Sequence, residues 1–317
     1  MNKLLKKQYL ITLVLLSTVI ILSVIFVPRI LSPENIFIML RNASIVGILA
    51  VGLTFVIITG GIDLSIGSIL ALGSGICSAL LKYYGMSFFP SIVLTLVLVG
   101  ICGFINGIFI TQFKIRPFVA TLGSMAIFSS VSLSLSKNIV GFRTIDNFNL
   151  IYWGHVGFLS IPTIIWAVLF FAAGFILKYT YFGRYLYALG DSRTALVLMG
   201  VNIVRYEILA YSLCGLFAGC AGIIMLSRTS NVMAGDNISL VFDAITAVSL
   251  GGISLNGARD RLAGVLLGTL TVVFCSDFMT FLSVDSLFQG AFKGLMFLSA
   301  AALDENLRKN FSGLIKG

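Results

Sequence analysis

Long apolar stretches alternate with short polar connections along nearly the whole chain. A helix needs about 20 apolar residues to cross the hydrocarbon core of a membrane, and about ten stretches approach that length. The pattern predicts an all-α polytopic membrane protein with about ten transmembrane helices, some of them broken at Gly-Gly pairs. The predicted spans are approximately 8–27, 42–59, 65–83, 90–111, 117–135, 161–178, 206–226, 242–253, 262–280 and 287–303.

The composition favours a membrane protein over a soluble enzyme. Of the 317 residues, 58% are hydrophobic and 10% are charged, whereas soluble domains are about 45–50% apolar and about 25% charged. One soluble globule cannot enclose an apolar excess of this size. Because the connections between the predicted spans are short, we expect a single transmembrane domain over residues 1–317.

The net charge of +9 is interpreted as a sign of topology rather than of nucleic-acid binding, because cytoplasmic loops gather Lys and Arg. With the N-terminus inside and alternating spans, the outside would hold six basic residues. Lys293 lies within the last span, which leaves 14 of the 21 basic residues inside. This bias predicts both termini inside (N-in/C-in). It places a basic loop of about 178–205 inside and an aromatic loop of about 136–160 outside, where Tyr152 and Trp153 are expected to anchor at the membrane interface.

The reactive side chains are too few for most enzyme chemistry. The single histidine, His155, cannot build a metal site or a catalytic triad alone. The five cysteines lie inside apolar runs at no metal-ligand spacing, so we expect no metal site. A phosphate-binding loop of the pattern GxxxxGK followed by Ser or Thr is absent from the sequence, so we expect the chain itself to bind no ATP or other cofactor.

A Gly-Gly pair follows the second predicted span, in the stretch IITGGIDLSIG (57–67). Adjacent glycines weaken a helix, and Asp63 and Ser65 are natural caps for a restarted one. A carboxylate at or near membrane depth is costly and is by default a functional candidate. Two interpretations stay open: Asp63 caps the next helix at the cytoplasmic surface, or it contacts a substrate or a gate.

A second Gly-Gly pair echoes the first. The stretch AVSLGGISLNG (247–257) repeats the pattern Gly-Gly-Ile-x-Leu 191 positions later. Interrupted apolar segments in corresponding halves of a chain point to a transport path. In the predicted topology both copies face the cytoplasm, which suits a parallel repeat better than an inverted one. The pattern leaves that choice, and chance similarity, open.

A short helix is predicted inside the basic loop. Asp191 or Ser192 caps it, it runs for about two turns, and Gly200 ends it. The helix carries the apolar side chains of Leu196, Val197 and Met199, although it lies outside the spans. It either docks on a partner protein or lies flat on the lipid surface, and the pattern alone does not choose between these two.

Four stretches of the sequence resemble the permease subunits of the monosaccharide (ribose-type) ABC importer family, which is related to the branched-chain amino acid permeases. The most specific is AVGLTFVIITGGIDLSIGS (50–68), which is nearly the family signature. The others are RPFVATLG (116–123), ALGDSRTALVLMGV (188–201) and DAITAVSLGG (243–252). The resemblance extends over approximately residues 35–305 and therefore covers the predicted fold.

This resemblance implies a function and partners. The chain would be the transmembrane permease subunit of an ATP-driven importer, not an enzyme itself, and would form the translocation path for a monosaccharide or sugar-like solute. It would lie as a multi-pass protein in a bacterial inner membrane. Its partners would be an ABC ATP-binding subunit that holds ATP and Mg²⁺, an extracytoplasmic substrate-binding protein and a second permease chain in a homo- or heterodimer.

The resemblance also assigns roles to residues. The short helix in the basic loop would be the coupling helix, on which the ATP-binding subunit docks. Its residues are Asp191, Ser192, Arg193, Thr194, Ala195, Leu196, Met199 and Gly200. A neutral sugar needs hydroxyl and amide partners rather than charges. The residues expected along the translocation path or gate are Asn42, Thr54, Thr59, Gly60, Gly61, Asp63, Ser65, Asn106, Thr121, Ser249, Gly251 and Gly252.

The alternative function is an ion-coupled secondary transporter. Such a protein needs paired intramembrane acids and bases that form a relay. The candidates for that relay are Asp63, Asp243, Asp277 and Lys293.

Overall fold

The computed structural model describes residues 2–137, 148–254 and 262–315, and it places a helix at each of the ten predicted spans. These ten helices are α1 (Asn2–Phe26), α2 (Pro33–Ile58), α3 (Ile66–Lys82), α4 (Phe88–Thr111), α5 (Pro117–Lys137), α7 (Ile161–Tyr179), α10 (Ile203–Thr229), α11 (Ile238–Leu250), α12 (Ala263–Phe281) and α13 (Ser286–Ile315). The longer connections contain α6 (Leu150–Trp153), β1 (His155–Val156), β2 (Leu159–Ser160), α8 (Tyr181–Asp191) and α9 (Arg193–Leu198).

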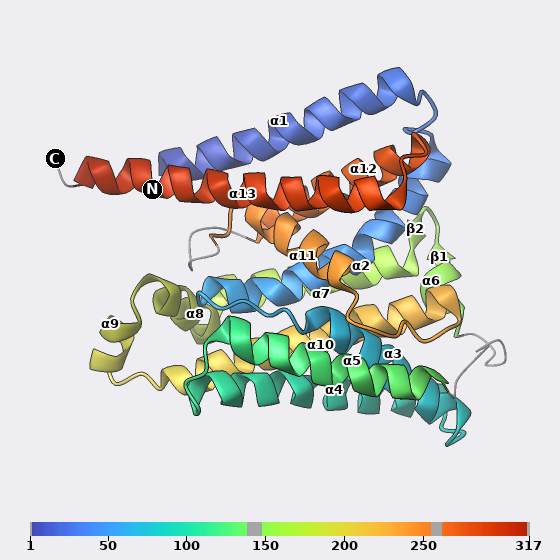
Figure 1. The fold of residues 1–317 in the computed structure, drawn as a ribbon, viewed down its shortest axis with the longest axis horizontal. Helices are drawn as coiled ribbons and strands as arrows, with labels where there is room; N and C mark the ends of the chain where they lie inside the picture. Colours follow the sequence, from blue (N-terminus) through green and yellow to red (C-terminus); the bar gives the residue numbers. More distant parts are fainter. Residues whose placement is uncertain (1, 138–147, 255–261, 316–317) are drawn as a thin grey trace.

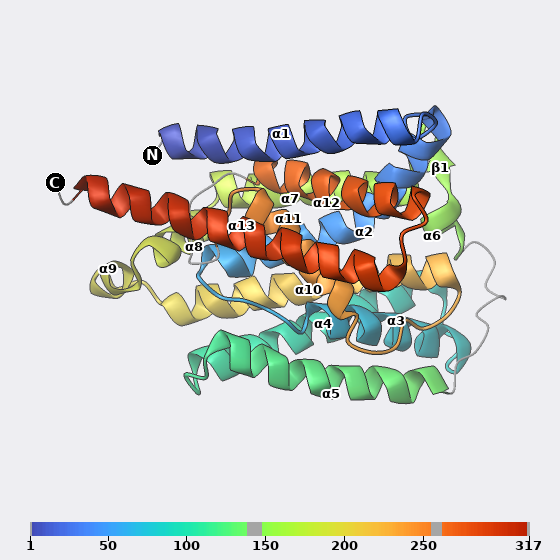
Figure 2. The same ribbon diagram turned by 45° about the horizontal axis from the view of Figure 1, so that its top comes forward.

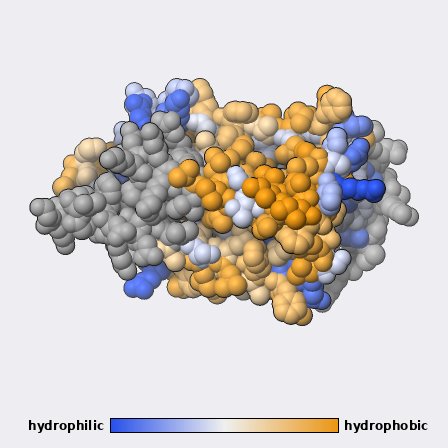
Figure 3. Space-filling model, turned by 90° about the horizontal axis from the view of Figure 1, so that it is seen from above, coloured by the Kyte–Doolittle hydropathy of each residue, from blue (hydrophilic) through white to orange (hydrophobic). Residues whose placement is uncertain are grey.

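The long helices lie side by side along the long axis of the molecule (Figures 1 and 2). One end carries α8, α9 and both termini, and we call it the α9 end (Figure 1). The opposite end carries α6 and the antiparallel pair β1–β2, and we call it the hairpin end. Apolar side chains cover the middle of the face shown in Figure 3, whereas hydrophilic ones gather toward the two ends.

Six helices in the described part of the chain are long and apolar enough to cross a membrane: α2, α4, α5, α7, α10 and α12. The prediction of an all-α, multi-pass membrane protein is therefore confirmed. At 1.5 Å per residue, α3 with 17 residues and α11 with 13 residues are too short to cross the hydrocarbon core alone. The count of ten spans and the N-in/C-in orientation stay predictions.

The two short helices α3 and α11 begin in the middle of the molecule. After α2 ends at the α9 end, the chain runs without helix into the interior, where α3 starts toward the hairpin end (Figures 1 and 2). The chain leaves α10 at the hairpin end, and α11 runs back from the middle in the opposite sense. The two helix starts touch, because a Cβ on Gly67 would collide with the backbone oxygen of Asp236. The units α2–α3 and α10–α11 are therefore inverted relative to each other, and the parallel repeat that the Gly-Gly echo favoured is wrong.

The Gly-Gly pairs end helices and do not interrupt them. In each case a glycine with positive φ follows the helix: Gly60 (φ 80°) after α2 and Gly252 (φ 92°) after α11. The N–H of the next residue then bonds to the carbonyl five residues earlier, which is the Schellman arrangement. The glycine with positive φ is thus the first of its pair after α2 (Gly60) and the second of its pair after α11 (Gly252). The predicted span 242–253 ends at Leu250 for this reason, and residues 255–257 of the echo lie outside the described residues.

An aromatic cage holds Arg41 of α2 at the hairpin end. Its guanidinium carbon lies 4.8 Å from the ring centroid of Tyr152 and 4.7 Å from that of Trp153. The Tyr152 hydroxyl donates a hydrogen bond to Asn42 at 3.1 Å. Tyr152 is buried, so the prediction that it is a simple interfacial anchor is wrong, whereas Trp153 remains exposed.

Glycines bring α4 and α10 into close contact. A Cβ on Gly215 of α10 would lie 2.6 Å from the carbonyl oxygen of Val99 and 3.2 Å from the Cα of Gly103 on α4. Small residues at a crossing allow this approach in lipid, where association depends on packing. The contact fixes α10, which carries part of the site described below, against the helix that follows α3.

We predict that Gly215→Ala lowers the free energy of unfolding by about 1–3 kcal/mol, because the new methyl group must displace the α4 backbone. The measurement is thermal unfolding of the purified chain in detergent. Gly123→Ala on α5 is the control, since a Cβ there meets no atom within 4 Å. Equal melting temperatures for the two variants would contradict the close α4–α10 contact.

Candidate functional site

A polar network holds the segment between α2 and α3 inside the bundle. The Asp63 carboxylate accepts hydrogen bonds from the backbone N–H of Ser65 at 2.9 Å and from its hydroxyl at 2.6 Å. The Asn106 amide of α4 donates to the Ser65 hydroxyl at 2.8 Å. All three side chains are fully buried. Ser65 is therefore the N-cap residue of α3, and Asp63 bonds to Ser65 rather than to the first turn of the helix, in the interior and not at the surface.

Helices α5 and α10 hold the same segment from two further sides. The Thr121 hydroxyl of α5 donates to the carbonyl of Ile62 at 3.3 Å. Tyr211 of α10 lies against Gly61, where any Cβ would collide with its hydroxyl. Among the described residues, that hydroxyl and one oxygen of Asp63 have no hydrogen-bond partner. The structure thus brings four predicted path residues together: Asp63, Ser65, Asn106 and Thr121.

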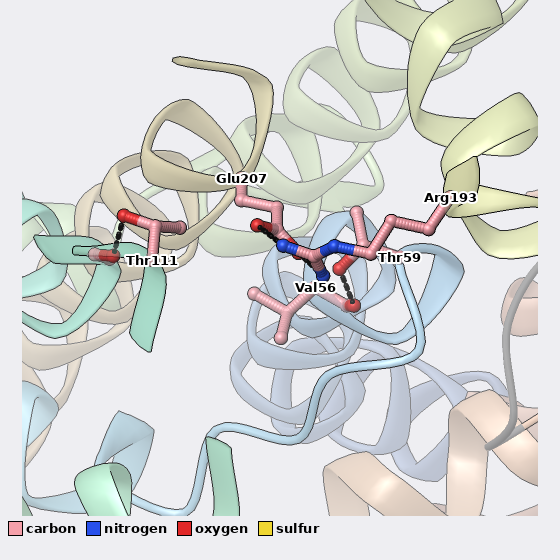
Figure 4. Close-up of polar contacts among 6 residues, drawn as sticks. Val56, Thr59, Thr111, Arg193 and Glu207 are labelled. Atoms are coloured by element: carbon pink, nitrogen blue, oxygen red, sulfur yellow. Dashed lines mark hydrogen bonds and ion pairs between the residues drawn. The ribbon is translucent and has the colours of Figure 1, made fainter. Parts of the chain in front are cut away.

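A cavity of about 530 Å³ opens below this network at the α9 end. It lies where α2 and α4 end and where α5 and α10 begin, with part of its wall shown in Figure 4. Its lining residues are Thr59, Gly60, Gly61, Ile110, Thr111, Lys114, Ile115, Arg116, Pro117, Arg193, Ile203, Val204, Glu207 and Tyr211. A volume within about 300–1,000 Å³ is typical of small-molecule sites.

A two-pronged ion pair joins α9 to the cavity wall (Figure 4). The two terminal nitrogens of Arg193 each lie 2.7 Å from one carboxylate oxygen of Glu207 on α10. The Glu207 side chain is 6% exposed and that of Arg193 is 55% exposed. Removal of the arginine would leave a buried carboxylate without its partner, which is costly. Arg193 therefore anchors α9, and its predicted contact with another protein stays a prediction.

The short helix of the basic loop starts and ends close to the predicted residues. The Ser192 hydroxyl accepts a hydrogen bond from the backbone N–H of Ala195 at 3.3 Å, so Ser192 is the cap, while Asp191 ends α8. Gly200 has a φ of 74° and ends the turn after α9. The side chains of Thr194 and Ala195 face outward.

The apolar residues of α9 divide into an anchor and an exposed tip. Leu196 is buried against the rest of the chain. Val197 and Met199 are exposed, and Leu198, which the sequence analysis did not single out, is 84% exposed. The tip Val197–Met199 protrudes from the α9 end (Figure 1). An apolar tip at this position is a surface for a partner protein or for lipid.

The remaining predicted path residues divide between the cavity and other parts of the bundle. Thr59, Gly60 and Gly61 line it, whereas Asn42 lies in the contact with Tyr152 at the hairpin end. The others are buried within α2, α11 and the turn after α11: Thr54, Ser249, Gly251 and Gly252. Conversely, the cavity contains Glu207 and Tyr211, which the sequence analysis missed. An acid in the first turns of an otherwise apolar helix was the available signal for Glu207.

A second ion pair joins α11 to α13. The Lys293 ammonium lies 2.7 Å from the Asp243 carboxylate, and both side chains are largely buried. The relay candidates Asp243 and Lys293 therefore neutralise each other, while Asp63 belongs to the separate network at α3. A buried pair of this kind fixes the position of the short helix α11 relative to α13.

A bundle of membrane-crossing helices, with two inverted helix units whose short helices start inside it, defines a membrane transport protein. The family model of the permease component of the branched-chain amino acid transport system matches residues 35–301. The chain belongs to this permease family, which confirms the resemblance stated above.

Several curated relatives of the chain are named as sugar import permeases. It is 37% identical to the ribose import permease protein of Bacillus subtilis over 90% of this chain and 89% of the relative. The ribose import permease protein of Escherichia coli is 35% identical over 94% and 93% of the two chains. The fructose import permease protein of Rhizobium meliloti is 31% identical over 94% and 85%. No solved structure matches the chain.

We predict that Arg193→Ala loosens α9, because the substitution removes its ion pair with Glu207. The expected loss is about 1–2 kcal/mol of local stability, since Arg193 is partly exposed and water screens the pair. Hydrogen–deuterium exchange of residues 192–200 should accelerate while exchange in α4 and α10 stays slow. Arg205→Ala, at an exposed position in the first turn of α10, is the control. Unchanged exchange in the Arg193 variant would contradict the anchoring role.

Proposed function

We propose that the chain is the permease subunit of an ATP-driven importer and forms the translocation path for a monosaccharide or sugar-like solute. The observation that carries this proposal is the link from the protruding α9 through Arg193 and Glu207 to the cavity wall. ATP hydrolysis takes place on a separate ABC ATP-binding subunit. This subunit docks on the tip Val197–Met199, so that displacement of α9 pulls on α10 next to the cavity.

The sugar class rests on the relatives, whose names include ribose, fructose and L-arabinose import. The buried hydroxyl and amide groups around Asp63 agree with a neutral, hydroxylated solute. The α9 end then faces the cytoplasm, with both termini inside, in a bacterial inner membrane. A substrate-binding protein delivers the solute at the hairpin end, and a second permease chain completes the pore.

Mild solubilisation of native membranes and purification through a tag on this chain tests the assembly. Co-purification of an ATP-binding subunit, and of a second permease chain, supports the importer. Reconstituted complexes are then assayed for ATP-dependent uptake across a panel of pentoses and hexoses. Uptake driven by an ion gradient without ATP would instead support the ion-coupled alternative.

We predict that Leu198→Asp abolishes co-purification of the ATP-binding subunit, because a charge then occupies the centre of the docking tip. Phe158→Asp is the matched control. Phe158 lies in the β1–β2 turn at the opposite end and is 96% exposed, so both variants place a carboxylate on an exposed apolar position. Quantitative immunoblotting of the purified complex measures the outcome. Equal loss of the subunit in both variants, or in neither, would contradict docking on α9.

A further inference from the structure

The cavity at the α9 end has a strongly cationic lining. Lys114, Arg116 and Arg193 contribute three basic side chains to it, against the single carboxylate of Glu207. That carboxylate is already bound by Arg193. Within the described ranges, no ion pair or hydrogen bond is recorded for the side chains of Lys114 and Arg116. The cavity therefore has two basic side chains whose charge is not neutralised by any protein group among the described residues.

Two helix starts add to this positive potential. The cavity is bordered by Arg116 and Pro117 at the beginning of α5, and by Ile203 and Val204 at the beginning of α10. Pro117 has no backbone N–H, and the N–H groups of Ile203 and Arg205 already bond to Val201 and to the Asn202 side chain. The two starts therefore contribute chiefly the partial positive charge of the helix dipole, which favours a nearby anion.

A buried donor also lines the cavity without a partner. Tyr211 belongs to the lining, and its hydroxyl lies against Gly61, another lining residue. The residue is 1% exposed, and in the described part of the chain its hydroxyl oxygen has no hydrogen-bond partner. A polar atom in such a position is normally hydrogen-bonded. A ligand oxygen that reaches the inner end of the cavity would satisfy it.

Lys114 occupies a backbone position that suits glycine. Its φ is 56°, and it follows the end of α4 where glycine usually stands. A lysine here costs backbone strain that glycine would avoid. A long basic side chain at a strained position agrees with a use for its charge.

We propose that this cavity binds a small phosphate-bearing anion, with Lys114, Arg116 and the starts of α5 and α10 around the phosphate and the Tyr211 hydroxyl as a donor at the inner end. The phosphate belongs either to a soluble compound such as a sugar phosphate or to an anionic lipid headgroup. The site does not depend on which solute crosses the membrane.

Titration of the full-length chain in phosphatidylcholine nanodiscs tests the proposal, with inorganic phosphate and ribose 5-phosphate as probes and neutral ribose as the control. Calorimetry should show saturable binding of both phosphates and weaker binding of ribose. Lys114→Gly and Arg116→Gln should each weaken binding roughly tenfold, the loss of one charge-assisted contact. Lys114→Gly relieves the positive φ, so it should fold at least as well as the native chain. Arg205→Gln, which lies outside the lining, should bind like the native chain.

A second set of nanodiscs that contain phosphatidylglycerol distinguishes the two sources. If phosphate still binds, the ligand is soluble. If these discs raise the melting temperature of the native chain but not of Lys114→Gly, and phosphate no longer binds, the ligand is a lipid headgroup. The proposal would be overturned if neither phosphate nor phosphatidylglycerol had an effect on the native chain. It would also be overturned if Lys114→Gly and Arg116→Gln both left such an effect unchanged.

Discussion

Non-helical backbone inside a membrane protein needs a protein partner for each of its polar groups, and the connection between α2 and α3 depends on this constraint. Ser65 donates two hydrogen bonds to one oxygen of Asp63, Asn106 reaches Ser65 from α4, and Thr121 bonds to the carbonyl of Ile62. Helices α4, α5 and α10 therefore have to surround the segment. The close glycine contact between α4 and α10 and the short length of α3 both follow from this enclosure.

The same enclosure places the cavity. Helix α2 ends at Ile58, and the chain turns inward after Gly60. The segment between α2 and α3 is therefore not helical below the polar network. The starts of α5 and α10 border the space that remains, and Glu207 lies on its wall. The ion pair with Arg193 then gives α9 a rigid connection to this wall. A single face of α10 thus joins α9 at the surface to the buried segment between α2 and α3. On that face Glu207 bonds to Arg193, and Tyr211, four residues later, lies against Gly61.

The sequence predicted the helices well because apolar length is a local property. It also placed the cap of α9 and the glycine ends of α2 and α11 within a residue or two. It did not predict that Tyr152 is buried, and it left open whether Asp63 lies at the surface or inside the bundle, since both depend on helices far away in the chain. The Gly-Gly echo was misleading for a physical reason. The same helix-ending turn follows the full-length helix α2 and the short helix α11. In the inverted repeat, however, α2 corresponds to α10. That helix ends at Ser230, which adopts the left-handed conformation without being glycine.

The cage around Arg41 has a consequence for the order of assembly. Arg41 belongs to the first third of α2, but the ring of Tyr152 that receives it is made more than 100 residues later. During synthesis the Arg41 guanidinium therefore lacks this ring while α3, α4 and α5 are made. The hairpin end can therefore close only after α6 has emerged, which is later than the synthesis of α2 to α5. A defect in these aromatic rings would reduce the amount of mature protein in the membrane before it affected the turnover of the molecules that do mature.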